Sequence, residues 1–150
     1  MYRVCAFTGH RNLNNCGFDA ALLDRVVRNL IITGTEEFLC GMAVGFDLAA
    51  AEAVIYHKQK YAVKLTACIP CANQTHLFSA RIKARYENII RYCDEVITLA
   101  PAYYDGCMLE RNRFMVDRCD ALVSFLRRNG GGTYYTVNYA RKAGKRIIEL

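Results

Sequence analysis

Hydrophobic residues along this chain gather in short continuous runs, which alternate with longer stretches where apolar and polar residues mix. The short runs show no alternation with period two, so each predicts a strand that is buried on both faces. These strands are expected at residues 2–8, 37–40, 63–69, 95–99, 120–126 and 146–150. The mixed stretches repeat apolar residues at helical spacing and predict helices at residues 19–32, 47–56, 74–92, 108–118 and 134–143.

Strands and helices therefore alternate from one end of the chain to the other. This order favours a parallel sheet, because two parallel strands need a long crossover connection and a helix supplies it. We expect a doubly wound, Rossmann-like α/β fold, with a mostly parallel sheet and helices on both faces. The length of 150 residues is typical of one domain, and no linker or internal repeat divides the chain. A single domain over residues 1–150 is the prediction.

Composition and charge narrow the classes of function. Hydrophobic residues make up 53% of the chain and charged residues 23%, which is typical of a globular protein. No apolar stretch approaches the roughly 20 residues of a membrane span, and the start of the chain reads as a strand and not as an export signal. We therefore expect a cytoplasmic protein with no membrane partner. The net charge of +6 suits an anionic small ligand and is modest for a dedicated DNA-binding protein.

Eight cysteines raise the question of a metal or redox site. Cys68 and Cys71 have CxxC spacing, but a zinc site needs about four ligands and the chain has no second pair of this kind. The three histidines, His10, His57 and His76, are far apart in the sequence. We expect reduced structural thiols, no bound metal and no required cofactor.

Candidate chemistry is concentrated in three glycine-bearing turns, each of which directly follows a predicted strand. They are Thr8-Gly9-His10-Arg11, Gly41-Met42-Ala43-Val44-Gly45-Phe46-Asp47 and Asn129-Gly130-Gly131-Gly132-Thr133. In a doubly wound sheet the carboxyl ends of the strands share one edge, where ligands bind near the switch in strand order. Free backbone N–H groups at a helix start bind phosphates. The three turns together predict a pocket for a phosphate-bearing ligand of nucleotide size, although each turn alone could be an ordinary loop.

The chain resembles the SLOG superfamily in the order and spacing of its motifs. The motifs that carry the resemblance are the three turns, the segment Arg111-Asn112-Arg113-Phe114-Met115-Val116-Asp117 and the pair Tyr139-Ala140. This superfamily joins the DprA/Smf DNA-processing proteins with the LOG nucleotide hydrolases. Within it, the chain looks most like the small YpsA/YoqJ-type proteins of Firmicutes and their prophages. The resemblance covers nearly the whole chain and implies a Rossmann-like fold with a nucleotide-type pocket.

The resemblance also implies a set of ligand-binding residues at the positions that match the family's motifs. They are Thr8, Gly9, His10, Arg11, Gly41, Met42, Ala43, Gly45, Asp47, Arg111, Asn112, Gly131, Gly132 and Thr133. Met42 stands where DprA-like members have the second glycine of GGAxGxD, which suits the YpsA/YoqJ branch. Arg11 offers a bidentate guanidinium to a phosphate, His10 could bind the ligand or pack in its turn, and Thr133 could cap its helix or donate to the ligand. Asp47 could bind a ribose hydroxyl, orient Arg11 or stabilise a helix start.

Arg111 matches the catalytic arginine of LOG hydrolases, but the catalytic glutamate of these enzymes has no counterpart here. Directly after the third turn the chain reads Tyr134-Tyr135-Thr136-Val137, and no carboxylate is present to steady an oxocarbenium ion or to activate water. Asp47, Asp105 or Glu110 could take over that role, and the sequence selects none of them. Arg111 could also be a solvated helix residue or form an ion pair. We therefore expect that the pocket is kept and that LOG chemistry is lost.

The favoured hypothesis is a binding protein for an ADP-ribose-like, cyclic or otherwise modified nucleotide. It would act as a sensor, a regulator or a sequestering protein in bacterium–phage conflict. One alternative is a hydrolase of nucleotide N-glycosidic bonds. A second is a single-stranded DNA binder like DprA, which ranks lower because the basic residues form no stripe in the sequence. A homodimer agrees with family behaviour. Four tyrosines could stack on a base or pack against the protein: Tyr103, Tyr104, Tyr134 and Tyr135.

Overall fold

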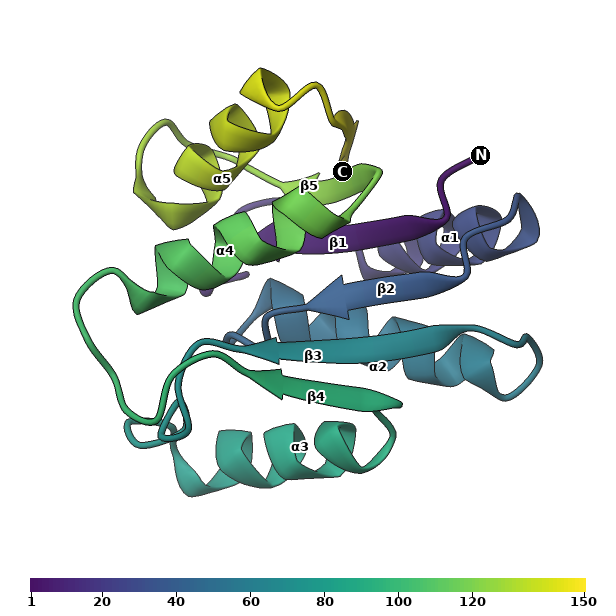
Figure 1. The fold of residues 1–150 in the computed structure, drawn as a ribbon. Coiled ribbons are helices and arrows are strands. Elements are labelled where there is room, and N and C mark those ends of the chain that lie inside the picture. The colour runs from purple at the N-terminus through teal and green to yellow at the C-terminus, as the bar shows by residue number, and fades with distance from the viewer.

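Strands and helices alternate along residues 1–150, all of which the computed structural model describes (Figure 1). The strands are β1 (Val4–Gly9), β2 (Glu37–Cys40), β3 (Lys64–Ile69), β4 (Glu95–Thr98), β5 (Ala121–Phe125) and β6 (Arg146–Glu149). The helices are α1 (Ala20–Ile32), α2 (Phe46–Lys58), α3 (Ala80–Arg91), α4 (Cys107–Arg118) and α5 (Gly131–Lys142). None of these helices combines the length and the apolar character that crossing a membrane requires.

The six strands form one sheet in the order β4-β3-β2-β1-β5-β6, and every neighbouring pair is parallel. The predicted doubly wound α/β fold is therefore confirmed. The chain builds outward from β1 to β4, crosses back through α4, and then continues outward through β5 and β6. Because such crossovers are right-handed, this reversal places α1 and α2 behind the sheet and α4 in front of it (Figure 1). The order switches between β1 and β5, where a doubly wound sheet opens a crevice at its carboxyl edge.

Two hydrophobic cores, one on each face, hold the helices to the sheet. Successive residues of β1 point to opposite faces. Phe7 therefore belongs to the core that includes residues of α1 and α2, while Ala6 belongs to the core that includes residues of α4 and α5. Phe7 also stacks on Phe38 of β2, with 5.3 Å between the ring centroids. Both faces of the central strands are buried, which is why these strands appear in the sequence as continuous hydrophobic runs.

The edge strands depart from the expectation that every strand is buried on both faces. No residue of β4 or β6 is fully buried, and Val96 of β4 is 46% exposed. Each of these strands has a neighbour on one side only, so less of it is covered than of a central strand. An apolar run of four or five residues carries no signal that separates an edge strand from a central one.

Two helix starts also differ from the sequence predictions. Helix α3 begins at Ala80, six residues later than expected, because Ser79 accepts a hydrogen bond from the backbone N–H of Ile82 and caps the helix there. Helix α5 begins at Gly131, three residues earlier than expected, with Gly130 as the residue before its first turn. Thr133 is therefore the third residue of α5, so of the two roles that the sequence left open for it, capping this helix is excluded. The other bounds lie within two residues of the predicted ones.

The cysteines are all free thiols, and most of them are buried. Burial raises the pKa of the Cys68 thiol to about 12 and that of the Cys5 thiol to about 11, so both stay protonated at neutral pH. No group of three metal-binding side chains comes together in the structure. The absence of a bound metal or a required cofactor stays a prediction.

Candidate functional site

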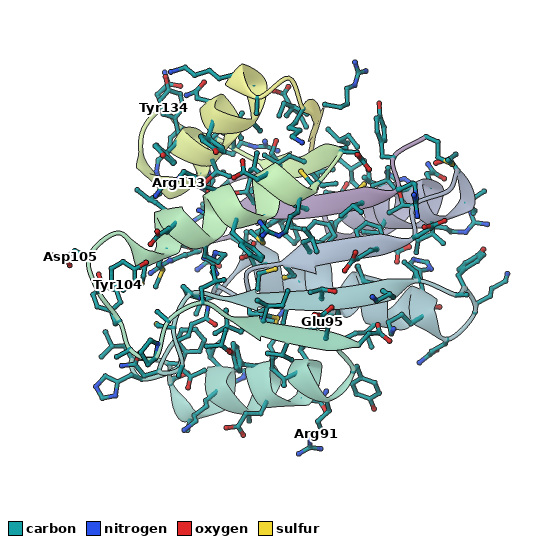
Figure 2. The ribbon with its side chains drawn as sticks, viewed as in Figure 1. Arg91, Glu95, Tyr104, Asp105, Arg113 and Tyr134 are labelled. Atoms are coloured by element: carbon teal, nitrogen blue, oxygen red, sulfur yellow. The ribbon has the colours of Figure 1, made fainter.

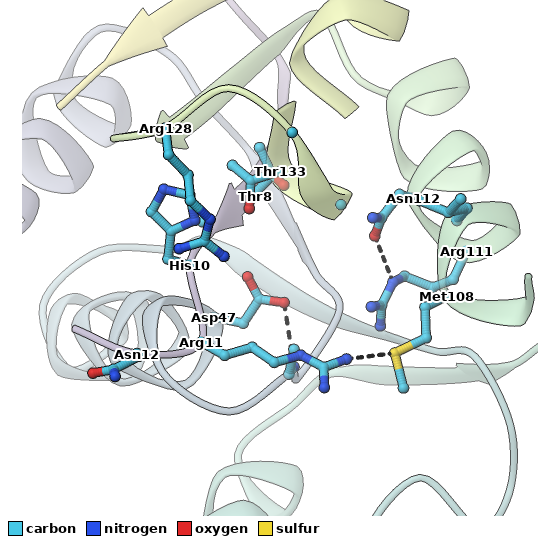
Figure 3. Close-up of a pocket in the computed structure, with 15 residues that line it drawn as sticks. Thr8, His10, Arg11, Asn12, Asp47, Met108, Arg111, Asn112, Arg128 and Thr133 are labelled. Atoms are coloured by element: carbon cyan, nitrogen blue, oxygen red, sulfur yellow. Dashed lines mark hydrogen bonds between the residues drawn. The ribbon is translucent and has the colours of Figure 1, made fainter. Parts of the chain in front are cut away.

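A pocket of about 320 Å³ opens at the carboxyl edge of the sheet, next to the point where the strand order switches between β1 and β5. We call it the edge pocket. Four segments build it: the turn after β1, the turn before α2, the first residues of α4, and the turn that leads into α5. It is lined by Thr8, Gly9, His10, Arg11, Asn12, Ala43, Asp47, Met108, Leu109, Arg111, Asn112, Arg128, Gly130, Gly132 and Thr133 (Figure 3). Segments far apart in the sequence thus meet at one site.

Most of the residues that the sequence singled out lie on this pocket. Ten of the fourteen line it: Thr8, Gly9, His10, Arg11, Ala43, Asp47, Arg111, Asn112, Gly132 and Thr133. Gly41, Met42, Gly45 and Gly131 do not. The side chain of Met42 is fully buried in the core behind the sheet, so it presents nothing to a ligand.

The second turn shapes the pocket through close backbone approaches. Gly45 precedes α2 with φ of 90°, and a Cβ there would lie 2.2 Å from the carbonyl oxygen of Arg11. A Cβ on Gly41 would lie 2.6 Å from Cζ of Arg111. Only glycine leaves room for both contacts, so these two residues support the site from behind while other residues face the ligand space.

Arg111 is buried in α4, with only 3% of its surface exposed, and it is not the solvated residue that the sequence allowed. Its Nη1 donates to the carbonyl oxygens of Gly41 and Cys68, and its Nε donates to Oδ1 of Asn112 at 2.8 Å. No carboxylate oxygen lies within 4.0 Å of this guanidinium. Burial lowers the pKa of Arg111, and the charge of Asp47 offsets part of that effect.

The remaining nitrogen of this guanidinium faces the edge pocket. Nη2 of Arg111 donates to no protein atom, and no buried side-chain nitrogen or oxygen in the protein lacks a hydrogen-bond partner. Nη2 must therefore reach the open space of the pocket that Arg111 lines. A buried cation whose free donors point into a pocket, with no carboxylate to neutralise it, is suited to bind an anion.

Asp47 places a single carboxyl group on the edge pocket that Arg111 also lines. It lies in the first turn of α2 with 6% of its surface exposed, and its Oδ2 accepts a hydrogen bond of 3.2 Å from the backbone N–H of Ala43. Burial raises the pKa of Asp47 to about 6, while Arg111, the Ala43 N–H and Arg11 oppose the rise. Oδ1 accepts no hydrogen bond from the protein and is free to accept one from a ligand.

Two further guanidinium groups stand at the pocket without an acidic partner. Nη2 of Arg11 donates to the thioether sulfur of Met108 at 2.8 Å, and a thioether is a weak acceptor. Arg128 makes no side-chain hydrogen bond and no ion pair, and it lies beside His10 on the opposite wall (Figure 3). With Arg111 they give three cations against one carboxyl group, so the pocket favours a negatively charged ligand.

His10 has a structural hydrogen bond in its turn. Its Nε2 accepts from the backbone N–H of Arg127 at 2.8 Å, and its ring meets Phe125 edge-on at 5.8 Å between centroids. Burial, followed by the charges of Arg128 and Arg127, lowers the pKa of His10, which favours the neutral ring. The sequence left packing and ligand binding open for this residue. The structure shows the packing role and leaves Nδ1 for a ligand.

The start of α5 offers backbone donors to the same space. No side chain accepts from its first N–H groups, and Gly130, Gly132 and Thr133 line the pocket there. The hydroxyl of Thr136 donates to the Gly132 carbonyl at 2.7 Å and accepts from Nδ2 of Asn112 at 2.9 Å. This hydrogen bond ties α5 to α4, so the free N–H groups are held near Arg111.

The other candidates from the sequence lie outside the edge pocket. Tyr104 and Asp105 sit on the loop before α4, and Tyr134 lies on α5 away from the sheet (Figure 2). The hydroxyl of Tyr104 donates to Glu110, and that of Tyr135 accepts from Arg113 at 2.8 Å. None of the four tyrosines lines this pocket, and of the three carboxylates proposed for catalysis only Asp47 does. Stacking of a tyrosine on a base stays a prediction.

Five lining residues were not among the fourteen expected to bind the ligand: Asn12, Met108, Leu109, Arg128 and Gly130. Asn12 directly follows the first turn, Arg128 directly precedes the third turn, and Gly130 belongs to the third turn. Proximity to the turns was therefore a usable signal. Met108 and Leu109 carried no such signal, because the packing of α4 against the sheet brings them to the pocket.

Comparison with known proteins gives a family match and several similar structures. A family model described as the YspA SLOG family matches residues 5–147. YoqJ, an SPbeta prophage-derived protein of Bacillus subtilis, is 29% identical over 131 residues, which cover 78% of this chain and 77% of that protein. DNA processing protein A of Helicobacter pylori, solved for its single-stranded DNA binding mode, has a TM-score of 0.72 at 18% identity. The molybdenum cofactor carrier protein of Chlamydomonas reinhardtii has a TM-score of 0.61 at 14% identity.

The two solved structures share the fold over the whole of this chain. The alignment covers 98% of the chain for the Helicobacter protein and 100% for the Chlamydomonas protein. It covers 77% of the Chlamydomonas protein but only 64% of the Helicobacter protein, so this chain spans less than two thirds of that DNA-processing protein. At these identities the similarity shows the fold alone.

Proposed function

The chain belongs to the YspA SLOG family, and on that premise we propose that it binds a nucleotide-derived small ligand through a phosphate group in the edge pocket. The ligand would be ADP-ribose-like, cyclic or otherwise modified, and the protein would act as a sensor, a regulator or a sequestering protein. The observation that carries the proposal is the guanidinium of Arg111, which is buried, has no carboxylate partner and has a free nitrogen on the pocket.

Phosphate chemistry fits the donors that this pocket presents. The N-terminus of a helix carries a partial positive charge and free N–H groups, and a phosphate oxygen accepts from both these groups and a guanidinium. Here the start of α5 and Arg111 belong to the same pocket, with Arg11 and Arg128 at its walls. A doubly charged phosphate would replace the missing anionic partner of Arg111.

Asp47 restricts the ligand further, because its carboxylate repels an anion placed against it and favours a group that donates a hydrogen bond. Repulsion between two anions is strong in a pocket from which water is partly excluded. A ligand that carries hydroxyl groups beside its phosphate would instead donate to the free Oδ1 of Asp47. A ribose phosphate has both features, which supports a nucleotide-derived ligand over inorganic phosphate.

A ligand panel on the purified protein tests this proposal. We would measure thermal shifts and calorimetric affinities for phosphate, ribose 5-phosphate, nucleoside mono- and diphosphates, cyclic nucleotides and ADP-ribose. A ligand at about 100 times its Kd stabilises the fold by about 2.7 kcal/mol, which gives a clear rise in Tm. Small molecules released by denaturation would be identified by mass spectrometry. The absence of any shift at millimolar nucleotide would contradict the proposal.

The variant Gly132→Ala separates ligand binding from folding. A Cβ at Gly132 would meet no atom within 4 Å, and the backbone there is not in the left-handed region. Because alanine favours a helix by about 1 kcal/mol over glycine, the Tm is expected to stay the same or rise. The methyl group would instead crowd the N–H groups of α5, so the affinity for a ribose phosphate should fall about tenfold. An unchanged affinity in calorimetry would remove α5 from the binding site.

Hydrolysis of a nucleotide N-glycosidic bond is the second candidate function, and Asp47 is the observation that favours it. A carboxyl group with a pKa of about 6 lies close to the value that suits acid–base catalysis near neutral pH. Incubation of the protein with the nucleotide panel would then release free base, which chromatography detects. Recovery of intact nucleotides after long incubation would contradict this candidate.

Binding of single-stranded DNA is the third candidate, favoured by the three guanidinium groups at the pocket and by the fold shared with DNA processing protein A. Its signature would be an affinity for oligonucleotides that falls steeply as salt rises. A flat salt dependence, or no binding at low salt, would contradict it.

A further inference from the structure

A second hollow, of about 690 Å³, lies next to the edge pocket. The two cavities share Arg11, Met108 and Leu109, which form the border between them. The lining of the second hollow differs in character, because it is mainly apolar. Besides the shared residues it is lined by Cys71, Asn73, Gln74, His76, Leu77, Phe78, Tyr103 and Gly106. We call it the apolar hollow.

The walls of the apolar hollow come from two segments, residues 70–79 after β3 and residues 99–106 after β4. They run side by side beyond the carboxyl edge of the sheet (Figure 1). Two hydrogen bonds join them: Ala72 N donates to the carbonyl oxygen of Ala100 at 2.9 Å, and Tyr103 N donates to the side-chain Oδ1 of Asn73 at 2.9 Å. Hydrogen bonds within the protein therefore hold the two walls of the hollow together.

The floor of the hollow is anchored to the same residues that support the edge pocket. Nε2 of Gln74 donates to the Gly41 carbonyl at 2.9 Å, and Oε1 of Gln74 accepts from the hydroxyl of Tyr86 at 3.0 Å. The Gly41 carbonyl also accepts from Arg111. The two cavities thus share a rigid base, and their relative position is set by side chains that are already paired.

Large apolar side chains at the hollow stand in water. Leu77 is 90% exposed and Tyr103 is 57% exposed. Exposed apolar surface that gathers around a cavity is typical of a binding site, because a ligand removes it from water. Arg11 lies at the border, held only by the sulfur of Met108, and a guanidinium plane stacks well on a flat ring.

We propose that the apolar hollow binds the nucleobase, or an equivalent planar aromatic group, of the same ligand whose phosphate lies in the edge pocket. The inference rests on the proposed function and extends it by assigning a place to each half of the ligand. The border that the two cavities share, formed by Arg11, Met108 and Leu109, is the reason to assign one occupant to both. The change from cationic to apolar lining along this path matches the polarity of a nucleotide, which is anionic at one end and a flat ring at the other.

The test compares ligands that differ only in the base. Calorimetry would give the affinities of ribose 5-phosphate and of the four common ribonucleoside 5′-monophosphates for the wild type and for the double variant Leu77→Ala, Tyr103→Ala. Both side chains are largely exposed, so the fold should tolerate their loss. Tyr92→Ala is the matched control, because Tyr92 is 54% exposed and lies outside both cavities.

In the wild type, at least one monophosphate is expected to bind about tenfold tighter than ribose 5-phosphate, since the base buries apolar surface. The double variant should lose most of that difference and keep its affinity for ribose 5-phosphate within about twofold. The control should change neither value.

Three results would overturn the inference. The hollow does not hold the base if the base adds no affinity in the wild type. The same conclusion follows if the double variant loses as much affinity for ribose 5-phosphate as for the monophosphates. A double variant that loses affinity only for single-stranded oligonucleotides would show that this surface binds nucleic acid instead. In each case ribose 5-phosphate would still bind to the wild type. If neither it nor any monophosphate binds, the proposed function itself fails.

Discussion

Replacement of Arg111 by methionine is expected to reduce the affinity for a phosphate-bearing ligand by roughly 30- to 1000-fold, which corresponds to about 2–4 kcal/mol. Methionine keeps much of the side-chain volume and removes the only buried cation on the edge pocket. A phosphate would then enter a partly desolvated site without its charge-assisted donor. Calorimetry with the ligand identified in the panel measures the loss.

The fold should survive this substitution. The Gly41 carbonyl that accepts from Arg111 also accepts from Nε2 of Gln74, so it keeps a hydrogen bond in the variant. The contact of Arg111 with the Cys68 carbonyl is long, at 3.4 Å. We therefore expect a loss of about 1–3 kcal/mol in the free energy of unfolding, which chemical denaturation measures.

Arg113→Met is the matched control, because Arg113 lies two positions further on the same helix, does not line the pocket and bonds to Tyr135 at the surface. Its affinity should stay within about twofold of the wild type. Arg111→Lys should recover only part of the binding, since an ammonium keeps the charge but not the planar fork. If the two methionine variants bind equally well, the anion does not sit on Arg111.

Asp47→Asn is expected to stabilise the folded protein at pH 7, by on the order of 1–3 kcal/mol. The pKa of Asp47 is raised from 3.8 to about 6 in the folded protein, mainly by burial. A group with a raised pKa stabilises the fold fully below its unfolded value of 3.8 and loses that contribution as pH rises through about 6. At pH 7 the carboxylate is therefore buried at a cost that a neutral amide does not carry.

The pH dependence distinguishes this cause from a general packing effect. The stabilisation by Asp47→Asn should be largest at pH 7 to 8 and should nearly vanish at pH 4, where the carboxyl group is protonated in the folded state. Urea denaturation at these pH values measures it. Asp105→Asn is the control, because Asp105 lies on the exposed loop before α4 (Figure 2) and should show no such trend. A gain that is the same at pH 4 and pH 7 would contradict the raised pKa.

The stabilised variant should also bind less well to a ligand with ribose hydroxyls. The free oxygen of Asp47 is a stronger acceptor when charged, so the amide loses the charge-assisted part of a hydrogen bond. A cost to stability that improves ligand recognition is common at binding sites. Residues kept for function are often those that the fold alone would not select.

The fold could be predicted from the sequence because its signals are local. Continuous apolar runs and helical spacing mark the elements, and their alternation leads to a parallel sheet. The predicted start of α3 at residue 74 was wrong because the turns of residues 70–79 contain apolar residues at helical spacing. The helix begins only after Ser79, which caps it. The exposure of Val96 was missed because a strand's place in the sheet depends on the order of all its neighbours.

Local patterns in the sequence establish the order of strands and helices, and they place three glycine turns after strands that end at one edge of the sheet. What those turns present at that edge depends on how the chain packs. Gly41 and Met42 belong to a turn near the site yet do not line it, whereas Arg128 and Met108 do. Burial, hydrogen-bond partners and pKa values depend on which distant segments pack together, and no local pattern records this. The charge of Arg111, which has no carboxylate partner, and the apolar hollow next to the edge pocket both arise from such long-range contacts.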